Sequence, residues 1–218
     1  MHKYREKERG RVKFCEIVLL FTAASVLGTV LEGVWSVFEV GYWIYHTSLV
    51  FGPFNTIYGF GAVALYLISE RSSRLRLPTA FLLFAALGGA VEYFGGVLQA
   101  AVFGTRSWDY SGQLMNIGGY VCLLSVLVWG ALGVIFTRLI CPLLRRLFAK
   151  VNIDGVKPLA IFLCAFFILN GTITSVAIHR WQSGRIPKSE EGGFFAAIDE
   201  RFDNRTMREL FPTMRKIK

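Results

Sequence analysis

Five long apolar runs constrain this chain more than any other feature of its sequence. They cover approximately residues 14–38, 49–69, 78–103, 113–140 and 157–179. A transmembrane helix needs about 20 mostly apolar residues to cross roughly 30 Å of hydrocarbon. Because each run is long enough, we expect an all-α, polytopic transmembrane helical bundle of about five spans.

The composition agrees with a membrane protein and excludes other classes. Of the 218 residues, 54% are apolar and 18% are charged, whereas soluble domains are about 45–50% apolar and about a quarter charged. Intrinsic disorder is excluded because it requires low hydrophobicity. The net charge of +9 does not indicate a nucleic-acid partner, because the basic residues stand in short blocks between apolar runs rather than on one wettable surface.

The basic residues predict the orientation of the chain in a bacterial plasma membrane. Six Lys or Arg precede the first run, three lie within 71–76 and five within 138–157. The segments 39–48 and 104–112 together hold a single basic residue, Arg106. Since loops rich in Lys and Arg stay in the cytoplasm, we expect a cytoplasmic N-terminus and place 39–48 and 104–112 outside.

The runs also predict the organisation of the chain. We expect a basic N-terminus (1–13), a transmembrane core (14–142) of two hairpins (about 14–69 and 78–140), a cytoplasmic loop (143–156), a fifth transmembrane helix (157–179) and a charged tail (180–218). Five crossings place the tail outside, although it holds nine Lys/Arg against six Asp/Glu; long segments translocate largely regardless of charge. Within it, 194–211 has the spacing of an amphipathic surface helix, with Phe195, Ile198 and Phe202 on one side.

An internal repeat is indicated by a shift of sixty positions, which needs no gap. The shift superposes Leu27-Gly28 and Glu32 on Leu87-Gly88 and Glu92, and Gly52, Ile57 and Gly59 on Gly112, Ile117 and Gly119. Two such hairpins would enter the membrane from the same side and be related by an axis along its normal, with the fifth helix added outside. Chance matching of Gly- and Leu-rich helices is the alternative.

Two glutamates inside apolar runs are the strongest candidates for a functional site. A carboxylate inside a bilayer costs at least a few kcal/mol and usually marks a pathway, a pair or a site. Glu32 and Glu92 lie in the outer halves of their runs. Gly28 and Gly88 precede them by one turn, and small residues on that face let helices approach closely. The alternative role for both carboxylates is a structural hydrogen bond to a neighbouring helix.

Three segments on the predicted outer side supply the other candidate ligand-binding residues. These residues are Asn55 and Tyr58, then Trp108, Asp109 and Tyr110, and finally Asn116, with Gly52, Pro53, Gly59 and Gly119 as backbone or hinge positions. Gly and Pro disfavour a continuous helix, so a broken or re-entrant start is expected before residue 58. Backbone freed at that depth must be buried in protein or line a wet cavity.

Several kinds of chemistry are excluded by the motifs that the sequence lacks. It contains no G-x-x-x-x-G-K-[ST] for nucleotide phosphates, no G-x-S-x-G and no H-E-x-x-H. The four cysteines stand singly and the three histidines form no spaced metal motif. We therefore expect no metal, no cofactor and no conventional catalytic residue, and an enzyme is the less favoured class.

The order of these motifs resembles the CmpB family, described as type IV permeases of ABC transporters in Gram-positive bacteria. The resemblance covers roughly residues 17–142. It rests on Leu27-Gly28 with Glu32, Gly52-Pro53-Phe54-Asn55-Thr56-Ile57-Tyr58-Gly59, Glu92-Tyr93, Trp108-Asp109-Tyr110-Ser111 and Asn116-Ile117-Gly118-Gly119. The chain departs from the family pattern where His46-Thr47-Ser48 replaces N-R-G, Asn55-Thr56 replaces C-P and Tyr120 replaces an Arg. These departures predict a different ligand from that of relatives, or none.

Three functions follow from these observations. The first is a permease-like transport component with an outward-facing polar pocket lined by membrane carboxylates. It would lie in the lipid bilayer and assemble either with a separate ATPase subunit or with further copies of itself. Residues 138–157 are the best docking segment for an ATPase. The second is a structural or regulatory membrane subunit, in which Asp109 caps a turn at the start of the fourth span. The third is a membrane enzyme of the outer leaflet that uses Asp109, Glu32 and Glu92 as acid–base groups.

Overall fold

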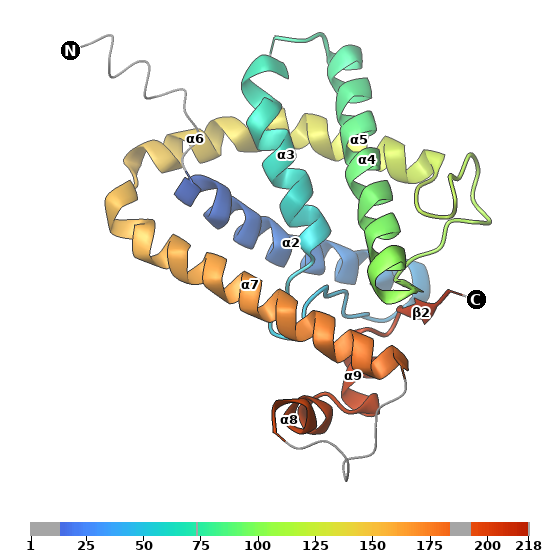
Figure 1. The fold of residues 1–218 in the computed structure, drawn as a ribbon. Helices are drawn as coiled ribbons and strands as arrows, with labels where there is room; N and C mark the ends of the chain where they lie inside the picture. Colours follow the sequence, from blue (N-terminus) through green and yellow to red (C-terminus); the bar gives the residue numbers. More distant parts are fainter. Residues whose placement is uncertain (1–13, 73, 184–192, 218) are drawn as a thin grey trace.

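The chain is a helical bundle that carries one two-stranded ribbon (Figure 1). The structure is a computed structural model that describes residues 14–72, 74–183 and 193–217. The basic N-terminus expected at 1–13 and part of the expected tail lie outside these residues. The elements are α2 (Phe14–Val40), α3 (Thr56–Ser72), α4 (Leu77–Phe103), β1 (Thr105–Arg106), α5 (Leu123–Ile135), η1 (Phe136–Ile140), α6 (Cys141–Lys150), α7 (Ile153–Ser183), α8 (Phe194–Arg201), α9 (Asn204–Leu210) and β2 (Arg215–Lys216).

Among the described residues, four helical stretches are long and apolar enough to cross a membrane. They are Phe14–Val40, Leu77–Phe103, Leu123–Lys150 and Gly155–Ser183. The apolar part of α3 is shorter and covers only Thr56–Ser69. The expectation of an all-α, multi-pass membrane bundle is therefore confirmed, whereas only four of the five expected spans reach full length.

The second and fourth helices both follow non-helical segments, which we expected from Gly52 and Pro53 for the second helix but not for the fourth. Residues 49–55 and 113–122, which we expected at the starts of these spans, are not helical. Gly52, Gly118 and Gly119 adopt positive φ angles of 81°, 60° and 74°, a conformation that no α-helix contains. The segment 143–156, expected as a loop, is instead helical in α6 and in the first turn of α7.

Both α3 and α5 begin halfway along the helix that precedes them. The amide of Asn55 donates to the carbonyl of Ser25 at 2.9 Å, fifteen residues before α2 ends, which is about 22 Å along the helix. Likewise, Gly89 of α4 faces Val121 and Val126 at the start of α5, although α4 continues to Phe103. The chain therefore enters the bundle twice as a non-helical segment, once before α3 and once before α5.

Side chains of α7 satisfy the backbone of the first non-helical segment. Asn170 accepts from the amide of Phe51 at 3.2 Å and donates to its carbonyl at 2.7 Å. Thr174 accepts from the amide of Val50 at 3.0 Å. Asn170 is only 2% exposed. Because non-helical backbone at membrane depth must find partners in the protein, these bonds let residues 48–55 lie inside the bundle.

The tail packs against one end of the bundle, which we call the loop end because it holds residues 41–55 and 104–122. β2 pairs antiparallel with β1, and Thr105 lies opposite Lys216. The expected amphipathic helix is divided into α8 and α9, which lie against the end of α7 (Figure 1). Ile198 and Phe202 are buried against Val50 and α7, whereas Phe195 is exposed. The apolar side of the tail thus faces the bundle.

The opposite end holds the starts of α2, α4 and α7 and the ends of α3 and α6, and we call it the basic end. Here Arg145 donates to the hydroxyl of Ser69 at 2.7 Å, and Arg138 donates to the carbonyl of Leu75 at 2.5 Å. Tyr66 donates to Glu16 at 3.2 Å. Of the arginines that we assigned to orientation, Arg145 thus also fixes α6 to the last turns of α3, and Arg138 fixes η1 to the turn between α3 and α4.

Two glycines set how closely the helices pack. A Cβ on Gly28 would lie 2.4 Å from Cγ of Tyr58, and one on Gly88 would lie 2.5 Å from Cβ of Trp129. The rings of Tyr58 and Trp129 contact each other, with centroids 5.5 Å apart. Each long helix therefore packs through a glycine against an aromatic residue of the following helix, and the two aromatic residues meet.

We predict that Gly88→Ala destabilises the protein. The added methyl group overlaps Cβ of Trp129, and such overpacking costs about 1–3 kcal/mol. Gly171→Ala is the matched control, because a Cβ at Gly171 meets nothing within 4 Å and alanine favours a helix by up to about 1 kcal/mol. Thermal unfolding in detergent should show a lower midpoint for Gly88→Ala only. Equal midpoints would refute the close packing of α4 on α5.

Candidate functional site

Four of the predicted site residues meet between α2, α3, α4 and the loop before α5. Tyr58 donates its hydroxyl to Oε1 of Glu32 at 2.6 Å. Tyr110 donates its hydroxyl to Oε1 of Glu92 at 3.0 Å. We call these four residues the carboxylate–tyrosine cluster. Each glutamate comes from a long helix, and each tyrosine comes from the chain that follows that helix.

The two pairs form one electrostatic unit. Glu32 and Glu92 interact with each other, and each also interacts with the tyrosine that the other carboxylate binds. Glu92 is only 8% exposed, and its Oε2 has no hydrogen-bond partner in the structure. Glu32 is half-buried. This oxygen forms no hydrogen bond of normal geometry, although Ser125 and Trp129 lie beside the carboxylate, and an unsatisfied buried group of this kind is costly.

The cluster lies where the two shorter helices begin. Tyr58 is in the first turn of α3, and Ser125 and Trp129 of α5 lie beside Glu92. The partial positive charge at a helix N-terminus favours nearby carboxylates. Sequence reasoning missed Ser125 and Trp129. The sequence feature that could have indicated them is a polar side chain and a large amphipathic side chain, four residues apart, within an apolar run.

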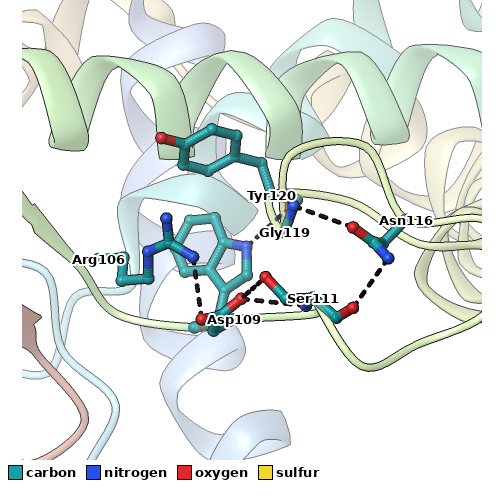
Figure 2. A network of polar contacts seen from close by, with 7 residues as sticks. Arg106, Asp109, Ser111, Asn116, Gly119 and Tyr120 are labelled. Atoms are coloured by element: carbon teal, nitrogen blue, oxygen red, sulfur yellow. Dashed lines mark hydrogen bonds and ion pairs between the residues drawn. The ribbon is translucent and has the colours of Figure 1, made fainter. Parts of the chain in front are cut away.

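A second polar network closes residues 105–122 on themselves (Figure 2). Trp108 donates its indole N–H to the carbonyl of Tyr120 at 2.9 Å. The amide group of Asn116 donates to the carbonyl of Ser111 at 3.1 Å and accepts from the amide of Gly119 at 3.3 Å. Trp108 and Asn116 thus hold the loop in shape, and the Trp108 ring packs on Gly96 of α4, one turn after Glu92.

Asp109 belongs to the same loop network. Its Oδ1 accepts from the amide and the hydroxyl of Ser111 at 3.0 and 2.5 Å, and its Oδ2 pairs with Arg106 at 2.9 Å. The bonds from Ser111, together with the charge of Arg106, hold the pKa of the exposed Asp109 carboxyl below its ordinary value. The expected capped turn is present, but it does not start a span. α5 begins at Leu123 and is capped by Cys122 and Ser125.

The remaining candidate positions shape the chain before α3. Gly52 and Pro53 turn residues 48–55 into the bundle, and Thr47 donates to the carbonyl of Gly52 at 3.1 Å. Asn55 binds α2 through its backbone. Gly59 allows close packing, since a Cβ there would lie 2.3 Å from Oγ of Ser25. Among the described residues, no group of three His, Cys, Asp or Glu could hold a metal ion.

We predict that Gly119→Ala opens the loop network. Gly119 has a φ of +74°, and a Cβ there would lie 2.6 Å from Oδ1 of Asp109. A positive φ alone costs a non-glycine residue about 1–2 kcal/mol, so amide exchange of residues 105–122 should accelerate by roughly tenfold. Gly112→Ala is the control, because Gly112 has no neighbour within 4 Å. Unchanged exchange in Gly119→Ala would contradict the assigned role.

Comparison with known proteins gives one family match. No curated protein matches the chain, and no solved structure does. The model of one family, described as "Putative ABC-transporter type IV", matches residues 19–175. This range includes all of the carboxylate–tyrosine cluster and the loop network, and it extends beyond the 17–142 of the resemblance into α7. It covers more than half of the sequence, so this chain belongs to the CmpB family of ABC-transporter type IV membrane proteins.

Proposed function

We propose that this chain is the permease-like component of a transport system and that the carboxylate–tyrosine cluster lines its outward-facing polar pocket. The observation that carries the proposal is Glu92, which is 8% exposed and whose Oε2 forms no hydrogen bond of normal geometry, although Ser125 and Trp129 lie beside the carboxylate. A structural carboxylate in a membrane bundle would satisfy both of its oxygens. An unused buried oxygen supports a role in binding.

The two shorter helices support the same proposal. Transporters commonly place their binding sites where paired, interrupted helices meet near the middle of the membrane. Here α3 and α5 each follow a non-helical segment, and Tyr58 and Trp129 meet beside the carboxylates. We also propose that the two hairpins, α2–α3 and α4–α5, are parallel repeats. After the first helix of each hairpin, the alignment of the two sequences must contain a gap, since Ile57 and Gly59 are helical whereas Ile117 and Gly119 are not.

The chemistry of the cluster favours a cationic ligand. The negative charge of Glu32 acts on Glu92, and two carboxylates that repel each other are stabilised when a positive charge or a proton lies near both. The tyrosine hydroxyls and the ring of Trp129 add acceptors and a π-face for a cation. The proposed substrate or coupling species is therefore a proton, a monovalent metal ion or a solute with an ammonium group.

The energy source is proposed to be a separate ATPase subunit. The sequence holds no P-loop, so the chain itself has no such site for ATP, and the family name points to an ABC transporter. At the basic end, α6 exposes Arg146, Leu147 and Lys150. With the predicted cytoplasmic N-terminus, this end faces an ATPase, and α6 is the best docking segment.

A structural or regulatory subunit is the second candidate function. It is favoured by the loop network of residues 105–122, in which Asp109 and Asn116 are fully engaged with their neighbours. The same bonds weaken the enzyme hypothesis, because its third acid–base group, Asp109, is occupied by Arg106 and Ser111 rather than joined to the two glutamates.

We predict that Glu92→Gln lowers the transport rate at least about tenfold without unfolding the protein. The amide has the same shape but no charge, and losing a charge-assisted contact costs about 1.5–3 kcal/mol, which is about tenfold or more in rate or affinity. The measurement is uptake of H⁺, Na⁺, K⁺ and methylammonium by proteoliposomes, with and without the co-purified ATPase. Glu16→Gln is the matched control, since Glu16 also binds a tyrosine, Tyr66, but lies at the basic end.

The two candidate functions give opposite results in this experiment. Transport requires flux in the wild type and in Glu16→Gln, and at least tenfold less in Glu92→Gln at an equal unfolding midpoint. A structural role predicts a lower midpoint and poorer expression for Glu92→Gln. If no probe moves through the wild type in either preparation, the transport proposal is wrong.

A further inference from the structure

A separate cavity lies at the loop end, between α7 and the tail. It has a volume of about 560 Å³ and is lined by Trp181 and Gln182 at the end of α7, and by Asn204, Arg208, Phe211 and Lys216 from the tail. None of these residues belongs to the carboxylate–tyrosine cluster or to the loop network. The cavity therefore calls for an explanation of its own.

The polar wall of the cavity has the character of an anion site. Arg208 and Lys216 give it two positive charges, Gln182 and Asn204 add amide donors, and none of the described residues that line it is acidic. Neither Arg208 nor Lys216 forms an ion pair with any residue that the structure describes. By contrast, Arg205, which lies on α9 like Arg208, pairs with Glu209 at 2.9 Å. Cations that converge on an acid-free cavity favour a ligand with a negative charge.

The two cations are held in place by the fold. Nε of Arg208 donates to the carbonyl of Asn204 at 3.2 Å, so the terminal nitrogens of the guanidinium are left for a ligand. Lys216 is part of β2, which pairs with β1, and the next amide, of Ile217, donates to the carbonyl of Gly104 at 2.9 Å. Because the backbone around both residues is bonded, the positive wall is a built feature rather than a frayed chain end.

The other wall is apolar and aromatic. Phe211 is 4% exposed and belongs to the buried cluster that joins the tail to α7, and Trp181 and Met214 continue this surface into the cavity. Tryptophan is typical of the level at which a membrane helix leaves the hydrocarbon. The ligand should therefore join an anionic head to an apolar or glycerol-like part and be accessible near the membrane surface.

We infer that this cavity binds a phosphate ester, with the phosphate between Arg208 and Lys216 and the attached group against Trp181 and Phe211. Arginine and lysine are the usual protein partners of phosphate. A phosphate-bearing lipid headgroup and a soluble phosphate ester share this chemistry. The site also accounts for the basic character of a tail that packs at the loop end, where the orientation rule predicts few cations.

The test compares two double variants of the full-length protein in detergent. Arg208→Gln/Lys216→Gln removes both cavity charges. Arg205→Gln/Arg215→Gln removes two charges from the same helix and strand, outside the cavity. Binding of phosphatidylglycerol is measured by native mass spectrometry, and binding of glycerol 1-phosphate and inorganic phosphate is measured by calorimetry. Unfolding midpoints show whether each variant is folded.

The inference predicts at least about tenfold weaker binding in the cavity variant and wild-type binding in the matched variant, because each lost charge-assisted contact is worth about tenfold. Binding of phosphatidylglycerol alone would identify a lipid headgroup, and binding of glycerol 1-phosphate as well would identify a phosphate ester of either source. If both double variants lose affinity equally, or if the wild type binds none of the three probes, the inference is wrong. Should Arg208→Gln/Lys216→Gln unfold, Arg208→Lys, which keeps the charge but lacks the planar guanidinium, must weaken binding while Arg205→Lys does not.

Discussion

The bundle depends on how it satisfies the backbone of residues 48–55. These residues enter between helices without forming one, and each unpaired N–H or C=O there would cost several kcal/mol in a hydrocarbon environment. Asn170 and Thr174 of α7 supply the missing partners. α7 is therefore more than an added outer helix. It allows α3 to start deep in the bundle, and that start brings Tyr58 to Glu32.

The carboxylate–tyrosine cluster follows from the same geometry. If α3 and α5 were full-length helices, Tyr58 would lie nearer the loop end, and residues 105–122 could not reach down to Glu92. The glycines at 28 and 88 then bring the aromatic side chains of α3 and α5 into contact with each other. Trp129 therefore lies both against Tyr58 and beside Glu92, and it joins the two halves of the cluster.

Local sequence signals predicted the membrane bundle and the members of the cluster, but not the way they are combined. Apolar length identified the helices because hydrophobic runs need no partner to be recognised. Glu32, Glu92, Tyr58 and Tyr110 were found because charge and Gly or Pro are rare in such runs. The broken start of α3 was predicted from Gly52 and Pro53, whereas the late start of α5 was missed, since residues 113–122 are apolar enough to be helical and two of their glycines adopt positive φ angles. The role of Asn170 was invisible because its partner lies 119 residues away.

The pairing of β1 with β2 has a consequence for the order in which this protein is made. Thr105 pairs with Lys216, 111 residues later in the chain. During synthesis at about 5–20 residues per second, α4 and the following loop must wait several seconds before their strand partner exists. In that interval Thr105 and Arg106 have no strand to pair with, whereas the bond from the amide of Tyr110 to the carbonyl of Gly119 lies within the loop and needs no part of the tail. The ribbon that joins the tail to the loop end can therefore form only after the loop itself has been made.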